Sequence, residues 1–169
     1  MDSELLDIVD VNNKVIGKAT REDCHNNPNL IHRTIHFTVI DRERNTILLT
    51  RRSFSKKHDP GKYCFPGEHM KSGEDYKEAI ARGLKEELNL TPKIFITANT
   101  NIFKFQKETE FVAFYITECS DYQIEFDRSE LEEIIWVNLD QIKNLDLDLS
   151  EMTKYWIQTV RWKSFFKPD

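Results

Sequence analysis

The 169-residue sequence is poor in glycine and proline, with five of each, and it contains no low-complexity tract or internal repeat. Because linkers between domains are usually rich in such residues, we expect one domain over residues 1–169, long enough to bury a core. No apolar run approaches the roughly 18 residues that a membrane helix needs. The N-terminal stretch MDSELLDIVD also lacks the basic and then apolar pattern of a signal peptide.

Cysteine and positive charge are also scarce. The three cysteines, Cys24, Cys64 and Cys119, form no CxxC pair, which excludes a disulfide framework and is typical of a reducing cytoplasm. With 24 basic and 29 acidic residues the net charge is −5, which argues against nonspecific binding to nucleic acids or membrane surfaces. We therefore expect a cytoplasmic protein without nucleic-acid or membrane partners, whose oligomeric state the sequence leaves open.

Strand-like and helix-like segments mix without regular alternation. LLDIVD and VIGKA, joined by the turn-like VNNK, predict a hairpin, and Thr20 is an expected N-cap of the following short helix. In the strand predicted at 31–41, alternation places Ile35, Phe37 and Val39 on one face and His32, His36 and Thr38 on the other. Further strands are predicted at 46–52, 93–105, 109–118 and 132–137, and helices at 75–88 and 151–165. This order favours an α+β fold or a layered α/β sandwich with a mixed sheet.

The helix predicted at 75–88 follows a glycine-bracketed loop, PGEHMKSGE, whose chain leads into the positive end of a helix dipole. Glu78, Arg82 and Glu86 are four residues apart and share one face, an arrangement that in most helices is only a solvated, salt-bridged surface. Gly83 is unusual there, because glycine inside a helix costs about 1 kcal/mol relative to alanine. Either another group approaches the helix at Gly83, or close packing excludes a side chain.

Glu74, Arg82, Glu86 and Glu87 resemble the Nudix box, in which a glycine, five residues, a glutamate and seven residues precede Arg-Glu-aliphatic-x-Glu-Glu-x-Gly-aliphatic. Gly73, Leu84 and Leu90 also agree with it, whereas Glu68 replaces the opening glycine, Gly83 the glutamate after arginine and Asn89 the closing glycine. The resemblance implies a Nudix-type α/β/α sandwich around a mixed β-sheet. It also implies catalytic roles for Glu86 and Glu87, with Arg82 at the substrate. The glutamate that Gly83 replaces usually helps to bind Mg²⁺.

Three histidines and two glutamates form a second set. His25 and His32 flank the loop NNPNLI, and His69 lies in the glycine-bracketed loop. Each histidine alone is more often a surface or core residue than a metal ligand. Glu108 and Glu110, two residues apart, point to the same face of an extended segment. Such a pair repels unless water or a cation compensates it, so an exposed edge strand fits equally well.

Taken in order, CHNNPNLIHR, SFSKKHDPG, GEH and the ExE pair resemble the type 1 isopentenyl-diphosphate isomerase branch of the Nudix superfamily, over about residues 8–137. Isomerases of this branch also lack the glutamate missing at Gly83. The resemblance implies one divalent metal ion with five ligands: His25, His32, His69, Glu108 and Glu110. A mixed imidazole and carboxylate site suits Zn²⁺ or Mn²⁺ better than Mg²⁺, whereas Glu87 would reach a Mg²⁺ ion bound to the diphosphate.

The same resemblance implies a diphosphate held by Arg21, Arg52 and Lys56, since guanidinium forks and ammonium groups suit phosphate oxygens. Without it, Arg52 and its neighbour Arg51 would be read as a solvated strand end. Trp156 corresponds to a tryptophan that faces a cationic intermediate in that family, because an indole face stabilises positive charge. A core tryptophan on an amphipathic helix is the other interpretation.

The resemblance to the isomerases fails at Gly67. In that family a glutamate at the Glu110 position and a cysteine at the Gly67 position share proton transfer, which glycine cannot perform. Cys64 lies three residues upstream, and a shifted strand could bring its thiol inward as a substitute. An odd offset faces the opposite side of an extended segment, however, so we expect a core cysteine.

Three functions follow from these patterns. The first is an isomerase-like enzyme that acts on an organic diphosphate through Glu110. The second is a Nudix pyrophosphohydrolase in which Glu86, Glu87 and the histidine site compensate for Gly83. The third is a non-catalytic sensor of diphosphates. In each case the expected partner is a small-molecule diphosphate, and in both enzymes the expected cofactor is a divalent metal ion.

Overall fold

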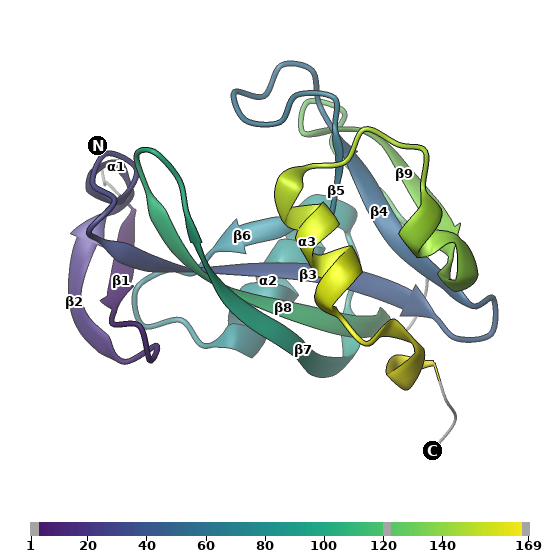
Figure 1. Ribbon diagram of the computed structural model, residues 1–169, viewed down its shortest axis with the longest axis horizontal. Coiled ribbons are helices and arrows are strands. Elements are labelled where there is room, and N and C mark those ends of the chain that lie inside the picture. Colours follow the sequence, from purple (N-terminus) through teal and green to yellow (C-terminus); the bar gives the residue numbers. More distant parts are fainter. Residues whose placement is uncertain (1–3, 120–122, 167–169) are drawn as a thin grey trace.

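The computed structural model describes residues 4–119 and 123–166, so both ends of the predicted 1–169 domain lie outside the described residues. A nine-stranded sheet lies between two helices, α2 behind it and α3 in front (Figure 1). The strands are β1 (Leu5–Val9), β2 (Val15–Thr20), β3 (Ile31–Asp41), β4 (Thr46–Arg52), β5 (Tyr63–Cys64), β6 (Gly67–His69), β7 (Pro92–Lys104), β8 (Thr109–Cys119) and β9 (Leu131–Asn138). The helices are α1 (Arg21–Cys24), α2 (Tyr76–Leu88) and α3 (Glu151–Thr159), with two 3-10 turns, η1 (Leu139–Asn144) and η2 (Trp162–Phe165).

Strand β3 organises the sheet. It pairs antiparallel with β1, β4 and β6, and parallel with β8, in a register that sets His32 opposite Glu110. The sheet is therefore mixed, as the sequence predicts. The short strands β5 and β6 are additions that the hydrophobic pattern does not predict, and β6 brings the glycine-bracketed loop alongside β3.

Alternation along β3 divides its side chains between two cores. Ile35, Phe37 and Val39 pack in one cluster with the apolar face of α2, including Ile80 and Leu84. The opposite face of the sheet packs against α3 in a second cluster that includes Phe65, Val112, Phe114, Trp156 and Ile157. These two layers confirm the predicted α/β/α sandwich, and even-numbered residues of β3 such as His36 and Ile40 face the α3 side.

Both ends of α2 are capped by local side-chain chemistry. Asp75 accepts from the backbone of Glu78, whose carboxylate accepts from the backbone of Asp75, so the pair forms a capping box. At the other end Asn89 adopts the left-handed conformation with φ 54°. Asparagine tolerates this conformation, so the replacement of the closing glycine of the Nudix box leaves the helix end intact.

The predicted helix at 151–165 is too long. Helix α3 ends at Thr159, and Val160 has an extended backbone before the η2 turn. This turn lets Trp162 pack against Phe65 and Phe114, with its Nε1 donating to the carbonyl of Ile157 at 3.1 Å. Tertiary packing of one indole therefore ends a helix that the amphipathic pattern alone would continue. None of the helices in residues 4–119 and 123–166 has the length and apolar character of a membrane span.

Candidate metal and diphosphate site

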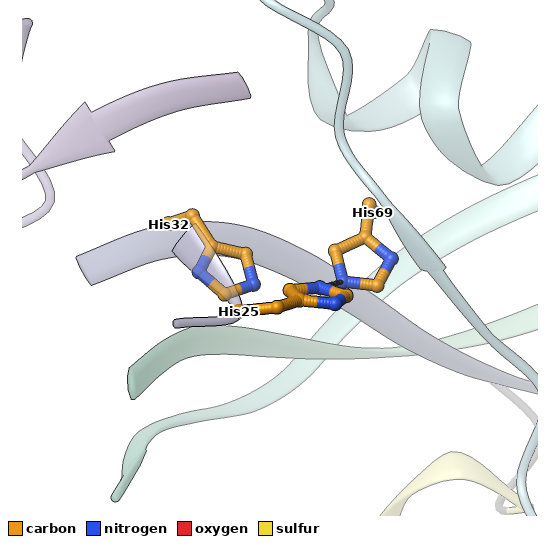
Figure 2. Close-up of side chains that lie close together, drawn as sticks. All are labelled: His25, His32 and His69. Carbon is orange, nitrogen blue, oxygen red and sulfur yellow. Dashed lines mark hydrogen bonds between the residues drawn. The ribbon is translucent and has the colours of Figure 1, made fainter. Parts of the chain in front are cut away.

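The three predicted histidine ligands come from three different elements and point toward one another (Figure 2). His25 caps the C-terminus of α1, His32 lies near the start of β3, and His69 ends β6. The Nε2 atoms of His25 and His69 are 2.9 Å apart. One ring nitrogen from each of the three lies within 4.8 Å of the others, a separation that a single metal ion can bridge.

Two carboxylates complete the cage, which we define as His25, His32, His69, Glu108 and Glu110. The parallel register of β3 and β8 sets Glu110 beside His32, and ligand atoms of His32, Glu108 and Glu110 lie within 4.8 Å of one another. Glu108 precedes the first residue of β8, and its Oε2 lies 3.4 Å from Nε2 of His25. The five residues that the sequence singles out are thus gathered at one place.

The chemistry of the cage fits a divalent metal ion. His32 is 0% exposed, and neither of its ring nitrogens has a hydrogen-bond partner among the described residues; such an orphaned group costs about 1–3 kcal/mol. Burial lowers the pKa of His32 to about 4 and holds that of His69 well below its usual value, so both rings are neutral, as metal ligands must be. Burial, with the neighbouring Glu108, raises the pKa of Glu110 to about 7. A cation would compensate these carboxylates.

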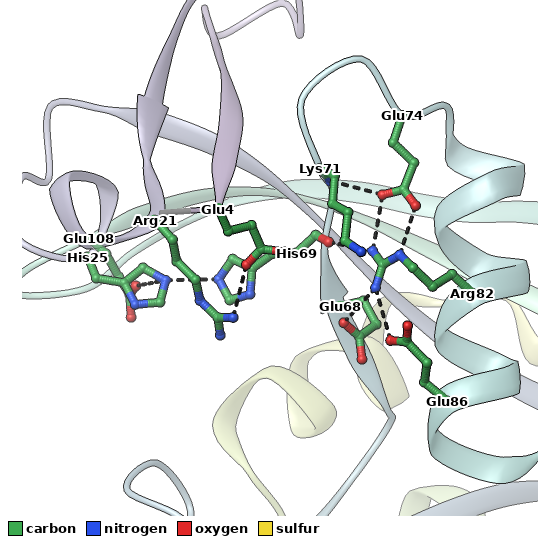
Figure 3. Close-up of polar contacts among 10 residues, drawn as sticks. All are labelled: Glu4, Arg21, His25, Glu68, His69, Lys71, Glu74, Arg82, Glu86 and Glu108. Atoms are coloured by element: carbon green, nitrogen blue, oxygen red, sulfur yellow. Dashed lines mark hydrogen bonds and ion pairs between the residues drawn. The ribbon is translucent and has the colours of Figure 1, made fainter. Parts of the chain in front are cut away.

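A second charged group surrounds Arg82 on α2 (Figure 3). The Arg82 guanidinium donates to Glu74 and to the carbonyl of His69, both at 2.8 Å, and its Nη1 lies 3.2 Å from Glu68 and 3.3 Å from Glu86. These acceptors occupy Arg82 within the protein. In this structure Arg82 thus ties α2 to β6 and holds the glutamates in position, and its expected role in substrate binding stays a prediction.

Glu87, which follows Glu86 on α2, lies among charges of both signs. Burial is the main cause that raises the pKa of Glu87 to about 7; Glu68 and Glu130 add to this effect, and Arg52 and Lys56 oppose it. Arg52 ends β4 and donates from Nε to the carbonyl of His58 at 3.0 Å, while Lys56 pairs with Glu130. The loop after β4 thus carries two of the predicted phosphate-binding cations to the vicinity of Glu87.

The other two arginines differ in their surroundings. Arg51 pairs with Glu133 at 3.2 Å and stacks on Tyr63, so its role is structural. Arg21 is half exposed on α1, where it pairs with Glu4 at 3.2 Å. Its positive charge helps to lower the pKa of His69.

Trp156 lies in the core. Its side chain is 0% exposed and stacks on Phe114 with ring centroids 5.2 Å apart, as expected for the core interpretation. Its Nε1 lies 3.4 Å from Nδ1 of His36, to which it donates. This contact leaves Nε2 of His36 as the nitrogen that carries the hydrogen in the neutral ring.

His36 is the residue near the site that the sequence patterns did not single out. A Cβ atom added to Gly67 would lie 2.5 Å from Cδ2 and 2.8 Å from Nε2 of His36, so the imidazole fills the space that a side chain at position 67 would need. The only sequence signal was the shared face of His32 and His36. Cys64 is buried with its Sγ 3.6 Å from Oγ1 of Thr50, and burial raises the pKa of its thiol to about 11.

A mixed sheet between two helical layers, with an arginine- and glutamate-bearing helix that follows a glycine-bracketed loop, defines the class of Nudix-fold enzymes. The family model of the NUDIX domain matches residues 31–158. This chain therefore belongs to the Nudix family, and the predicted resemblance to that family is confirmed.

Similar proteins include both hydrolases and isomerases. The chain is 29% identical over 145 residues to an uncharacterized Nudix hydrolase of Nostoc sp., covering 80% of this chain and 81% of that protein. It is 28% identical over 141 residues to a prenyl-diphosphate phosphatase of Methanosarcina mazei, covering 79% of each. It is 35% identical over 99 residues to an isopentenyl-diphosphate Delta-isomerase of Streptomyces griseus, covering 57% of this chain but only 49% of that protein.

The fold has a close structural counterpart. A crystal structure from Deinococcus radiodurans superposes with a TM-score of 0.73, covering 94% of this chain and 99% of that chain at 22% identity. At this level of identity the likeness establishes the fold alone.

Proposed function

We propose that this Nudix enzyme hydrolyses an organic diphosphate in a reaction that depends on divalent metal ions. The observation that carries the proposal is the position of Glu87, a half-buried carboxylate near Arg52 and Lys56. Cations that bind phosphate oxygens and a carboxylate that binds a metal ion are thus near one another. Similarity to a Nudix hydrolase and to a prenyl-diphosphate phosphatase, each over about four fifths of the chain, supports hydrolysis over isomerisation.

The residues divide the work as follows. Arg21, Arg52 and Lys56 bind the phosphate oxygens, and Arg82 holds Glu86 in place beside Glu87. Glu86 and Glu87 would hold Mg²⁺ at the diphosphate, and the cage would hold Zn²⁺ or Mn²⁺. Such ions neutralise phosphate charge and lower the pKa of water. Attack by water on one phosphorus then breaks the bridging P–O bond and releases inorganic phosphate.

We propose further that the organic half of the substrate is an isoprenoid chain. Two of the similar proteins are named for prenyl-type diphosphates, a phosphatase and an isomerase. In this chain Phe103 of β7 is paired with Glu110 of the cage and packs edge-on against Tyr155 of α3, with ring centroids 5.1 Å apart. These partly buried rings offer an apolar chain a contact surface next to the cage.

Two assays with Mg²⁺ and Zn²⁺ present test this proposal: release of inorganic phosphate from geranyl diphosphate, and formation of AMP and ribose 5-phosphate from ADP-ribose. We expect release from geranyl diphosphate that stops when a chelator is added, and slower cleavage of ADP-ribose. Faster cleavage of ADP-ribose would contradict the isoprenoid half of the proposal. Failure to cleave either diphosphate would contradict hydrolysis and favour the sensor.

Isomerisation through Glu110 is the second candidate, favoured by one observation. Glu110 is buried, accepts from Oγ1 of Thr34 at 3.2 Å, and has its pKa raised to about 7, so it can exchange a proton near neutral pH. The missing partner is a thiol at position 67.

A thiol at position 67 requires space that His36 now occupies, so Gly67→Cys must be combined with His36→Ala. If the chain is an isomerase that lacks only this thiol, the double variant should isomerise isopentenyl diphosphate about 100-fold faster than His36→Ala alone. Phosphate release should not rise in parallel. No gain in a folded, metal-loaded double variant would refute the second candidate.

A further inference from the structure

Two departures from the Nudix box touch each other in the structure. Glu68, which replaces the opening glycine, lies on β6, and Gly83, which replaces the glutamate after arginine, lies on α2. A Cβ atom added to Gly83 would lie 2.7 Å from Cγ of Glu68 and 2.9 Å from Cε1 of Phe37. Position 83 therefore has no room for a side chain while Glu68 and Phe37 keep their places, and Glu68 is the nearer of the two. This contact accounts for the glycine inside the helix.

We propose that these two residues form a reciprocal exchange, in which Glu68 supplies from β6 the metal-binding carboxylate that α2 lacks at Gly83. The inference rests on the proposed metal-dependent function. Residues four apart share a helix face, so position 83 and Glu87 belong to the same side of α2. The Glu68 side chain enters the space over Gly83 from the strand, and its carboxylate belongs to the charged group around Arg82.

The charges around Glu68 support this role. The side chain of Glu68 is only 21% exposed, so its carboxylate is held largely within the protein beside Arg82. Arg82 bonds one oxygen of Glu68, Oε2, at 3.2 Å. In the part of the chain that the structure describes, Oε1 has no hydrogen-bond partner, which leaves it free to bind a cation. Carboxylate oxygens alone suit Mg²⁺ or Mn²⁺, unlike the imidazole-rich cage.

Binding of Mn²⁺ to protein whose cage is already filled with Zn²⁺ tests the inference. The electron paramagnetic resonance signal of free Mn²⁺ gives the amount that remains unbound, and therefore the affinity of the remaining site. Glu68→Gln keeps the size of the side chain and should weaken Mn²⁺ binding by at least about 10-fold. Glu43→Gln removes the same charge from an exposed residue outside the site and should leave the affinity unchanged. Unchanged affinity in folded Glu68→Gln would mean that Glu68 only pairs with Arg82, and would overturn the inference.

The exchange can also be reversed. Glu68→Gly should weaken Mn²⁺ binding, and adding Gly83→Glu in the same chain should restore it, because removal of Glu68 frees the space over α2. Gly83→Glu alone should lower the melting temperature sharply, since it meets Glu68. In the double variant the glutamate introduced at position 83 still approaches Phe37, so the melting temperature of this variant is measured together with its Mn²⁺ affinity. If the double variant does not fold, the affinity of Glu68→Gln alone tests the exchange. A folded double variant without restored affinity would contradict the exchange.

The two proposals fail in different ways. If the wild-type protein releases phosphate but Glu68→Gln binds Mn²⁺ normally, the exchange is wrong and hydrolysis stands. If Glu68→Gln weakens Mn²⁺ binding but no diphosphate is cleaved by the wild-type protein, the metal site stands and hydrolysis is wrong.

Discussion

Replacing His32 with leucine is expected to abolish the stabilisation of this protein by Zn²⁺. In the wild-type protein, metal at about 100 times its dissociation constant should add about 2.7 kcal/mol to the free energy of unfolding. For a chain of this size that corresponds to a rise of roughly 5–10 °C in the melting temperature. The reason is that His32 belongs to both groups of ligand atoms in the cage.

The same variant should be no less stable than the wild-type protein when metal is absent. Two buried ring nitrogens without partners are replaced by an apolar side chain of similar size, which removes an unfavourable group from the core. Thermal unfolding with a chelator and with added metal measures both effects. The exposed His58 provides the control, because His58→Ala should keep the full metal-dependent rise. A Zn²⁺-dependent rise that survives in His32→Leu would contradict the cage.

Replacing Glu87 with glutamine should lower kcat/KM for phosphate release by at least about 100-fold, because even groups that only support a metal ligand cost 10–100-fold when removed. Glu110→Gln leaves four ligands in the cage and should lower phosphate release much less. Steady-state kinetics on both variants, with the metal content of each measured, checks this order. The melting temperature of each variant, compared with the wild-type value, shows whether that variant is folded.

The order of the two effects distinguishes the candidate reactions. If Glu110 transfers protons to carbon, Glu110→Gln should lower isomerisation by about 10²–10⁴-fold. A larger effect of Glu110→Gln than of Glu87→Gln on whichever product forms would therefore contradict hydrolysis at α2.

The sequence predicts the fold where local patterns coincide with the final packing. Alternation in β3 correctly separates Ile35 and Phe37 from His32, because successive side chains of a strand point to opposite faces of the sheet and only one face packs against α2. The end of α3 is missed, since the burial of Trp162 is a tertiary effect that no helical pattern contains. The short β6 is missed for the same reason: it is held by pairing with β3 rather than by its own apolar residues.

The candidate site divides in the same way. The cage residues are suggested by their types and order, and the structure brings them together. By contrast, the two contacts that explain the altered positions join residues far apart in sequence, His36 with Gly67 and Glu68 with Gly83. In the sequence alone, the altered residues at positions 67, 68 and 83 look like unrelated substitutions. Only the antiparallel pairing of β6 with β3, and the packing of α2 beside them, reveals that each glycine makes room for a particular side chain.

The most direct measurement is incubation of the protein with isopentenyl diphosphate, Mg²⁺ and Zn²⁺ in D₂O, followed by proton and phosphorus NMR together. The proposed function predicts released phosphate and a carbon skeleton without deuterium. Deuterium in the carbon skeleton, with the diphosphate intact, would contradict hydrolysis and assign the proton transfer to Glu110.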